Sequence, residues 1–354
     1  MKRTRKENTE GSTLSAQVKE HANQEVPKTP EYEGNVERVI STGSLQLDLA
    51  ISGGRVRGGG LPGGILVEVF GGNSTGKTVL LCEIAGDVQR KGGQVMFKDP
   101  EARLNKQFAR TFDMQPDQVD YDIPDTIEDL FTPVREWEPE PREGVIHAVL
   151  GDSLAALSTK MEMESEDKMG MKRAKDFSTQ CRKTCRVLAQ KNFLMVCSNQ
   201  VRQNADAGMF GQKYTAPGGE AIGFYSSVRL RTSAPTKLKK TKKIKGKDRS
   251  VVEGIKTTVE VYKNSVWKPY RTAEVYILFD YGIDDIRANL HFVKEVLGEK
   301  TYTVSGTNVG KGMEEAIAAV EADRLEKKLR TETMDLWYEL EEKLSVNRKR
   351  KRRF

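Results

Sequence analysis

The chain has 354 residues, which is enough for about two domains of roughly 100 to 200 residues each. With 37% hydrophobic and 31% charged residues and only four cysteines, the composition excludes collagen-like, coiled-coil and disulfide-stabilised proteins and a wholly disordered chain. The net charge of +7 comes from two local basic patches, so the rest of the chain is not basic.

The amino-terminal segment, residues 1–35, is polar and weakly patterned, which predicts a flexible arm. Its start, MKRTRKENTE, lacks the apolar run of a signal peptide, and no uncharged apolar stretch in the chain approaches the ~20 residues of a membrane helix. We therefore expect a cytoplasmic protein with no membrane partner. The four cysteines have no histidine partners nearby, so we expect reduced structural thiols rather than a zinc site.

A glycine-rich stretch, SGGRVRGGGLPGG at residues 52–64, contains a formal G-x-G-x-x-G match at Gly58, Gly60 and Gly63. A dinucleotide-binding fingerprint follows a strand and opens a helix. Here the match instead precedes the apolar run ILVEVFG. The pattern therefore favours a flexible turn that leads into a strand.

From residue 65 onward, short apolar runs alternate with helical patterns, which predicts an α/β protein with a mostly parallel sheet covered on both faces. Strands 228–232, 257–262 and 273–279 follow one another without room for crossover helices, so we expect them to extend the sheet in antiparallel fashion. The earlier strands are expected at 65–71, 94–98, 145–150 and 193–198, and the helices at 77–90, near 103–112 and at about 172–190.

The expected organisation is a core at residues 36–285, a small and mainly helical C-terminal α/β domain at 286–345 and a basic tail at 346–354. Residues 237–249 hold eight basic residues and one acid, and residues 343–354 hold seven basic residues and no acid. Such clusters neutralise phosphates on nucleic acid or serve as solvated, solubilising segments. Composition leaves both interpretations open.

The segment GGNSTGKT matches the phosphate-binding pattern G-x-x-x-x-G-K-[ST], between a buried strand and a helix as that pattern requires. Backbone N–H groups in such a loop turn inward around phosphates, and the helix N-terminus adds positive potential. Lys77 would reach the β- and γ-phosphates of ATP, and the Thr78 hydroxyl would bind Mg²⁺. The predicted nucleotide-binding residues of this loop are Gly71, Gly72, Asn73, Ser74, Thr75, Gly76, Lys77 and Thr78.

Three polar residues at the ends of predicted strands complete a candidate ATPase site, because the carboxyl ends of parallel strands border the ligand crevice. Asp152 closes VIHAVLGD and would join the metal shell. Glu101 follows QVMFKDP and would act as general base, and Gln200 ends FLMVCSNQ, where it could sense the γ-phosphate. Taken singly, each is more typical of a cap or turn, but the phosphate-binding loop favours the functional interpretation.

In order along the chain, STGSLQLDLAI, GGNSTGKT, KDPEARLN, GDSLAAL, SNQVR, MFG with PGGEAIGFYSSVRL, and YKNSVWKPYRTAE resemble the motifs of bacterial RecA, the family of ATP-dependent recombinases. The resemblance runs from about residue 39 to about residue 318. It implies a RecA-like P-loop ATPase core that polymerises as a helical filament on single-stranded DNA and pairs it with homologous duplex DNA in recombination and repair. The amino-terminal arm would then be a polymerisation segment.

The resemblance also implies roles for residues outside the phosphate-binding loop. Asn105 and Phe108 would hold the adenine, with Phe279 near the next protomer, and Phe224 and Arg229 would couple the nucleotide to the neighbouring subunit. Two DNA loops correspond to about residues 160–171 and 202–219. The implied DNA-binding residues are Arg202, Met209, Phe210, Gly211, Gly218 and Gly219, and the nearby Arg173 and Arg182 could touch phosphate or simply form an exposed face.

The second loop supports this assignment on physical grounds. A glycine-rich segment with Met and Phe side chains and flanking cations can become ordered on a phosphate backbone, with apolar groups between bases. An active-site lid without DNA contact is the alternative.

The sequence departs from the family in three ways. Lys263-Asn264-Ser265 keeps only the first of two lysines that reach the neighbour's ATP, the chain ends in RKRKRRF rather than an acidic tail, and residues 237–247 carry a lysine run. These departures are typical of a divergent, phage-type member. Two rival functions remain, a hexameric helicase-like motor of the same fold and an accessory DNA-binding protein that uses ATP only as a switch.

Overall fold

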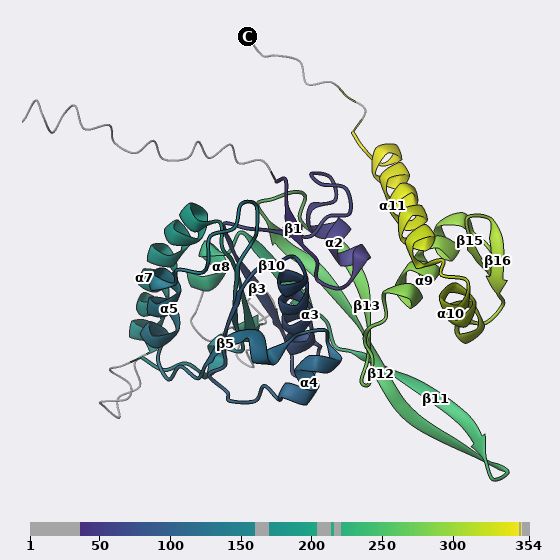
Figure 1. The fold of residues 1–354 in the computed structure, drawn as a ribbon, viewed down its shortest axis with the longest axis horizontal. Helices are drawn as coiled ribbons and strands as arrows, with labels where there is room; N and C mark the ends of the chain where they lie inside the picture. The colour runs from purple at the N-terminus through teal and green to yellow at the C-terminus, as the bar shows by residue number, and fades with distance from the viewer. Residues whose placement is uncertain (1–35, 160–169, 204–213, 216–220, 347, 349–354) are drawn as a thin grey trace, which may run out of the picture. The chain divides into compact units, whose positions relative to one another are not determined.

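The computed structural model describes residues 36–159, 170–203, 214–215, 221–346 and 348. A ten-stranded sheet lies at the centre of this part of the chain (Figure 1). Its strands are β3 (Ile65–Gly71), β4 (Val95–Lys98), β5 (Val119–Asp122), β6 (Ala148–Gly151), β7 (Leu194–Gln200), β10 (Val228–Thr232), β11 (Thr236–Ile244), β12 (Lys247–Asn264), β13 (Thr272–Leu278) and β14 (Gly282–Ile283). They lie in the order β14-β13-β12-β10-β3-β7-β6-β4-β5, and β11 pairs with β12 outside this row.

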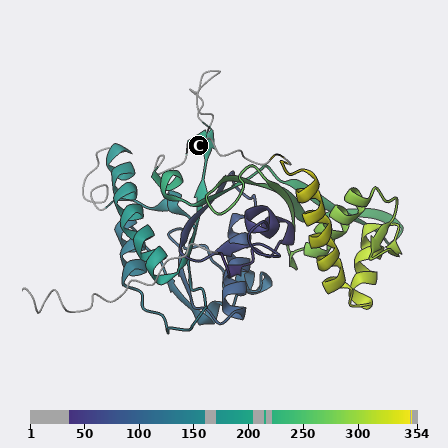
Figure 2. The same cartoon turned by 90° about the horizontal axis from the view of Figure 1, so that it is seen from above.

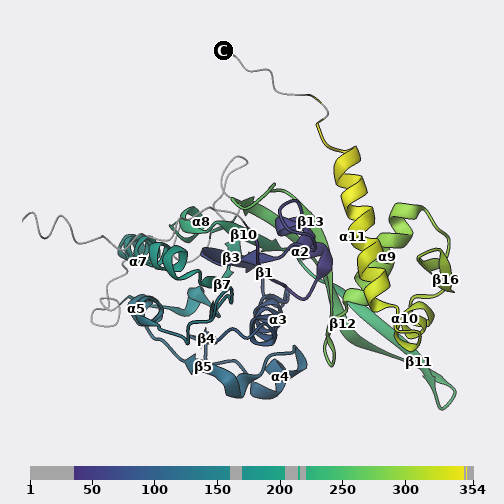
Figure 3. The ribbon, with the colours of Figure 1, turned by 45° about the horizontal axis from the view of Figure 1, so that its top comes forward.

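Both faces of the central strands of the sheet are buried, as their continuous apolar runs predict. In β3, Leu66 belongs to one hydrophobic cluster, whereas Val67 and Val69 belong to the other, because successive side chains point to opposite faces. Figure 3 shows the helices that cover the two faces. One cluster includes residues of α2 (Leu45–Ser52) and α3 (Lys77–Arg90), and the other includes residues of α5 (Ile127–Glu136), α7 (Gly170–Lys191) and α8 (Ala221–Tyr225).

The expected antiparallel extension is confirmed, because β10 pairs antiparallel with β12 and β12 pairs antiparallel with β13. The sequence does not predict that β10 also joins the parallel part of the sheet. β10 runs parallel to β3, with Arg229 opposite Glu68, and antiparallel to β12. The crossover that makes this possible includes the five-residue helix α8, directly before β10. A helix of this length is too short to give a recognisable periodic pattern in the sequence.

In the lysine-rich segment, where the sequence predicts a basic patch but no strands, β11 and β12 form a long antiparallel ribbon (Figure 1). Lys245 and Gly246 connect the strands, both with positive φ (49° and 78°), as a tight I′-like hairpin turn requires. β12 has 18 residues, and its first part pairs with β11 alone, whereas its later part pairs with β10 and β13 of the sheet. The ribbon is therefore a direct continuation of the sheet.

The residues after 285 build a hydrophobic cluster of their own, which includes Leu290, Tyr302, Val309 and Leu329. Figure 2 shows these green-to-yellow elements grouped together. An antiparallel pair of short strands, residues 302–304 and 307–310, accounts for the β part of the expected α/β composition. The domain boundaries stay a prediction. The elements are α9 (Asp285–Leu297), β15 (Tyr302–Val304), β16 (Thr307–Gly310), α10 (Met313–Ala322) and α11 (Glu326–Lys343). Within the described ranges, no helix combines the length and apolar character needed to cross a membrane.

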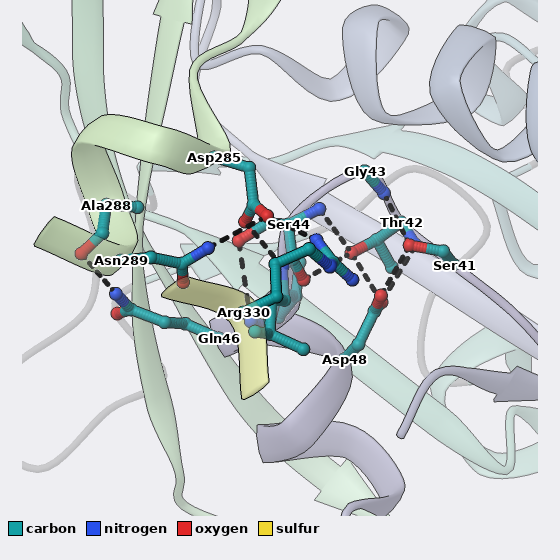
Figure 4. Close-up of polar contacts among 12 residues, drawn as sticks. Ser41, Thr42, Gly43, Ser44, Gln46, Asp48, Asp285, Ala288, Asn289 and Arg330 are labelled. Atoms are coloured by element: carbon teal, nitrogen blue, oxygen red, sulfur yellow. Dashed lines mark hydrogen bonds and ion pairs between the residues drawn. The ribbon is translucent and has the colours of Figure 1, made fainter. Parts of the chain in front are cut away.

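A buried polar cluster joins the start of α9 and α11 to the loop before α2 (Figure 4). The Asp285 carboxylate accepts a hydrogen bond from the backbone N–H of Leu45 at 2.8 Å and forms an ion pair with Arg330. Asp48, fully buried beside them, accepts hydrogen bonds from Thr42 N (2.8 Å) and Thr42 Oγ1 (2.8 Å). Burial raises the pKa of Asp48 to about 7.

The glycine-rich stretch at residues 52–64 leads into β3, as its position before an apolar run predicts, but it serves as a packing element rather than only as a flexible turn. A Cβ on Gly54 would lie 2.2 Å from Nε1 of Trp267, and one on Gly59 would lie 2.0 Å from the Asp48 carbonyl oxygen. The Tyr338 hydroxyl of α11 donates to the Gly53 carbonyl at 2.8 Å. The glycines therefore allow Trp267 and α11 to approach the backbone closely.

Candidate functional site

The phosphate-binding loop connects β3 to α3 in the predicted strand-loop-helix arrangement. Gly76 caps the helix with φ at 90°, and a Cβ there would lie 2.4 Å from Cδ1 of Ile277. A Cβ on Gly71 would lie 2.0 Å from the Thr232 hydroxyl oxygen. Any larger residue at these two positions would collide with a neighbouring strand, so glycine is required for the tight path of the loop.

Lys77, the first residue of α3, is buried and directed back along the loop. Its Nζ donates to the Gly72 carbonyl at 2.6 Å and approaches the Gly71 carbonyl at 3.4 Å. Burial lowers the pKa of Lys77, while the nearby Asp152 and Glu101 carboxylates raise it. In this structure the loop carbonyls therefore hold the ammonium group of Lys77 inside the loop.

Thr78 and Asp152 meet as predicted. The Thr78 hydroxyl donates to Asp152 Oδ2 at 2.6 Å, and the Ser198 hydroxyl donates to Oδ1 of the same carboxylate. Asp152 comes directly after β6, and Ser198 lies in the adjacent strand β7. Burial raises the pKa of Asp152, and the two hydroxyl donors oppose this shift.

Glu101 lies on the same side of the site, next to Gln200. Its Oε1 accepts hydrogen bonds from Ser153 Oγ at 2.9 Å and from Gln200 Nε2 at 3.1 Å. Its Oε2 forms an ion pair with Arg103 at 2.7 Å. Two residues that the sequence analysis placed at the ends of different strands are therefore in direct contact.

These groups border one cavity of about 1160 Å³. Asn105 caps α4 (Lys106–Thr111), and Phe108 stacks in tilted fashion on Phe112 with ring centroids 4.5 Å apart. Phe279 comes directly after β13 and also lines the cavity. In the strand order, β13 and β4 lie on opposite sides of β3, so Phe279 and the residues that follow β4 approach the cavity from different sides. The predicted residues that line the cavity are Asn73, Ser74, Thr75, Gly76, Lys77, Thr78, Glu101, Asn105, Phe108, Asp152, Gln200 and Phe279.

The cavity fits a nucleoside triphosphate with Mg²⁺. Its inner end offers backbone N–H groups, a lysine and a helix N-terminus, and its wall offers aromatic rings for a base. Among the described residues, no group of three or more His, Cys, Asp or Glu side chains is arranged around a metal. Mg²⁺ typically takes only one or two protein ligands and completes its shell with phosphate and water, so Thr78 and Asp152 suffice.

A row of four polar side chains, Asn199, Glu68, Arg229 and Lys263, crosses the neighbouring strands β7, β3, β10 and β12. We call it the polar row. Asn199 Nδ2 of β7 donates to Glu68 Oε1 of β3 at 2.9 Å, and Arg229 Nε of β10 donates to Glu68 Oε2 at 2.6 Å. Arg229 lies directly opposite Lys263 of β12. The guanidinium also stacks over the Phe70 ring, 4.5 Å from its centroid. Sequence reasoning named Arg229 and Lys263 but missed Glu68, which connects them to β7.

Lys263 contacts its own chain. Its Nζ donates to the carbonyls of Gly223 at 3.0 Å and Phe224 at 2.8 Å, at the end of α8. Burial and the charge of Arg229 lower the pKa of Lys263. The Phe224 side chain is 74% exposed. The roles of Phe224, Arg229 and Lys263 between subunits stay predictions.

Most of the predicted DNA-binding residues lie outside the described residues, namely Met209, Phe210, Gly211, Gly218 and Gly219. The backbone of Arg202 belongs to β8 (Arg202–Gln203), which pairs with β9 (Tyr214–Thr215). Arg173 turns inward and donates to the Ala155 carbonyl at 3.0 Å, whereas Arg182 is exposed. The inward contact of Arg173 favours a structural role for that residue.

Sequence reasoning missed three polar partners in the site, Ser153, Arg103 and Thr232. Ser153 follows Asp152 directly, so the sequence GDS contained a usable signal. The Thr232 hydroxyl lies 2.7 Å from that of Thr75. It lies at the end of β10, and the parallel pairing of β10 with β3, which the sequence did not reveal, brings it to the loop.

Comparison with known proteins agrees with this geometry. The family described as RecA N-terminal domain matches residues 12–284. Protein RecA of Delftia acidovorans (strain DSM 14801 / SPH-1) is 33% identical over 287 residues, which cover 79% of this chain and 73% of that protein. The phosphate-binding loop, the strand-end acids and the glutamine that contacts Glu101 all fall within the matched region, and the chain belongs to the RecA family.

Proposed function

We propose that this RecA-family chain is a cytoplasmic DNA-dependent ATPase. It binds ATP with Mg²⁺, polymerises as a helical filament on single-stranded DNA and pairs that strand with homologous duplex DNA in recombination and repair. Family membership supports the general activity. The observation that carries the proposal is the hydrogen bond between Glu101 and Gln200, because it connects the candidate general base to the strand that leads into the second predicted DNA loop.

Hydrolysis follows from the residues around the cavity. Lys77 exchanges its carbonyl partners for β- and γ-phosphate oxygens and stabilises their charge. Mg²⁺, when bound, would neutralise phosphate charge beside Thr78 and Asp152. Glu101 orients a water and accepts its proton as the water oxygen bonds to the γ-phosphorus. The bond to the bridging oxygen breaks, and ADP and phosphate leave.

Coupling to DNA would use the polar row across the sheet. Gln200 contacts Glu101, and the adjacent Asn199 contacts Glu68, which holds Arg229. A shift of β7 on binding DNA would therefore act on the general base and on α8 together. Exposed Phe224 at the end of α8 is suited to contact with a neighbouring subunit.

The decisive experiment measures ATP hydrolysis with and without single-stranded DNA and images the product by electron microscopy. DNA-stimulated turnover with extended filaments is expected. Closed rings would favour the hexameric motor, and binding of ATP and DNA without turnover would favour the accessory protein. Either result would overturn the proposed function.

A further inference from the structure

The part of the β11–β12 ribbon beyond the sheet has two different faces. Cross-strand partners share a face, and successive residues alternate between faces. Lys242 lies opposite Arg249, Ile244 opposite Lys247 and, on the same side, Lys240 opposite Val251. We call Lys242, Ile244, Lys247, Arg249 and Val251 the basic face. It carries three cations and no acid.

The opposite face of the ribbon carries less net positive charge. It is formed by the cross-strand pairs Lys239 with Val252, Thr241 with Ser250, and Lys243 with Asp248. Two cations on this face are accompanied by an acid and two hydroxyls. The charge of the ribbon is therefore concentrated on one side and at its tip, where Lys245 forms the turn.

The three cations of the basic face differ in their ion pairing from Lys240, which lies where the ribbon joins the rest of the sheet. Lys240 forms ion pairs with Glu253 at 3.2 Å and with Glu314 of α10 at 3.8 Å. Lys242, Lys247 and Arg249 are exposed, and none forms an ion pair with a residue in the described part of the chain. The ribbon is thus anchored at its base and presents uncompensated positive charge further out.

Two exposed apolar side chains lie among these cations. Ile244 is 53% exposed and Val251 is 62% exposed. A surface that combines cations with small apolar groups suits DNA, where phosphates flank grooves that contain sugar carbons and thymine methyl groups.

The shape of the ribbon selects duplex over single-stranded DNA. A major groove about 12 Å wide and about 8.5 Å deep admits a two-stranded β-ribbon. The outer part of β11, residues 239–244, extends about 20 Å at the usual rise of about 3.3 Å per residue. Residues 236–252 contain no aromatic side chain on which unpaired bases could stack, and no Asn or Gln, the side chains that read adenine edges.

We propose that the β11–β12 ribbon is a duplex-DNA-binding arm whose basic face enters the major groove and contacts phosphates without reading the sequence. This inference rests on the proposed function, because homologous duplex is the substrate that a filament on single-stranded DNA must capture. Binding that is independent of sequence suits that task, since any duplex must be sampled.

The arm is coupled to the core by β12 itself. The strand runs without interruption from the arm, past Ile255 at the nucleotide cavity, to Lys263 beside α8. A register shift in β11 between Leu238 and Lys239 marks the point where the arm leaves the sheet. A bulge of this kind bends and twists a strand pair, and so fixes the direction of the arm.

The test compares two full-length variants that each remove two positive charges from the same ribbon. The first, Lys242→Gln with Arg249→Gln, alters the basic face, and its control, Lys239→Gln with Lys243→Gln, alters the opposite face. Affinity for a short, mixed-sequence fluorescent duplex is measured by anisotropy over a series of salt concentrations. All four substituted residues are exposed, so each substitution should change the free energy of unfolding by no more than about 0.5 kcal/mol.

The basic-face variant should weaken duplex binding on the order of tenfold near physiological salt. It should also reduce the slope of log affinity against log salt by about 2, because each phosphate contact contributes about 0.9. The control should change the slope by much less. Equal effects of the two variants, no effect of either, equal loss of single-strand binding, or displacement of the duplex by polyglutamate as readily as by competitor duplex would each overturn the proposal.

A parallel assay separates this proposal from the proposed function. The basic-face variant should keep the ATP turnover that single-stranded DNA stimulates, while it loses duplex capture. If the unmodified protein shows no such stimulation, the proposed function fails. The salt slopes still decide whether the arm binds duplex DNA.

Discussion

Removing the arginine of the polar row tests whether the row acts as one electrostatic unit. Glu68 is 1% exposed, and its two oxygens accept hydrogen bonds from Arg229 and Asn199. Arg229→Met would replace the guanidinium stacked on Phe70 by an apolar side chain that can still pack on the ring, but would leave a buried carboxylate with a single neutral donor. Removal of one partner of a buried ion pair usually destabilises a protein by about 3–5 kcal/mol. Because Asn199 remains, we expect the lower end of that range.

The double variant Glu68→Gln with Arg229→Met removes the charge together with its partner. The glutamine can still accept from Asn199, so we expect this variant to lose at most about 2 kcal/mol, less than Arg229→Met alone. Glu68→Gln alone leaves Arg229 with 21% of its side chain exposed to water, which limits the penalty. The free energy of unfolding of all four proteins is measured by urea denaturation at pH 7. An additive cycle, with the double variant as unstable as the sum of the two single variants, would refute the reasoning.

Three further predictions concern the nucleotide site, the subunit contact and pH. Glu101→Gln should retain ATP binding but lose turnover by on the order of 10² to 10⁴, measured as phosphate release, whereas wild-type turnover would remove Glu101 from its role. Lys263→Ala subunits mixed with wild-type protein should lower turnover below the wild-type fraction, and strict proportionality would confine Lys263 to its own subunit. Burial raises the pKa of Glu83 from 4.5 to about 7, so stability should fall as pH rises through that window, and Glu83→Gln should remove up to about 3 kcal/mol of this fall in urea titrations.

The central features of the site could be predicted from the sequence because they depend on rules that act locally. The phosphate-binding loop is a contiguous motif, and Glu101, Asp152 and Gln200 each follow an apolar run. Parallel strands bring such positions to one edge of the sheet. The structure confirms that these residues border one cavity.

The features that were missed depend on pairing between distant segments. The ribbon has solvent on both faces over its outer part, so its strands lack the hydrophobic alternation that identifies a half-buried strand. Only the register shows that Lys242 and Arg249 share a face. Glu68 lies within the apolar run ILVEVFG and has no neighbour in sequence that would indicate its partners.

The contacts of Lys263 within the polar row show which interactions it would lose if its ammonium group moved to the nucleotide of a neighbouring subunit. Its ammonium group now satisfies two carbonyls at the end of α8, and it lies opposite the like-charged Arg229. Glu68 partly offsets this repulsion, because it raises the pKa of Lys263 while burial and Arg229 lower it. Movement of Lys263 toward a neighbour's phosphate would relieve the repulsion but leave the α8 carbonyls unpaired. Those carbonyls adjoin exposed Phe224, so the same movement would loosen this residue, which we propose for subunit contact. Nucleotide sensing and assembly would then depend on one rearrangement rather than on two independent ones.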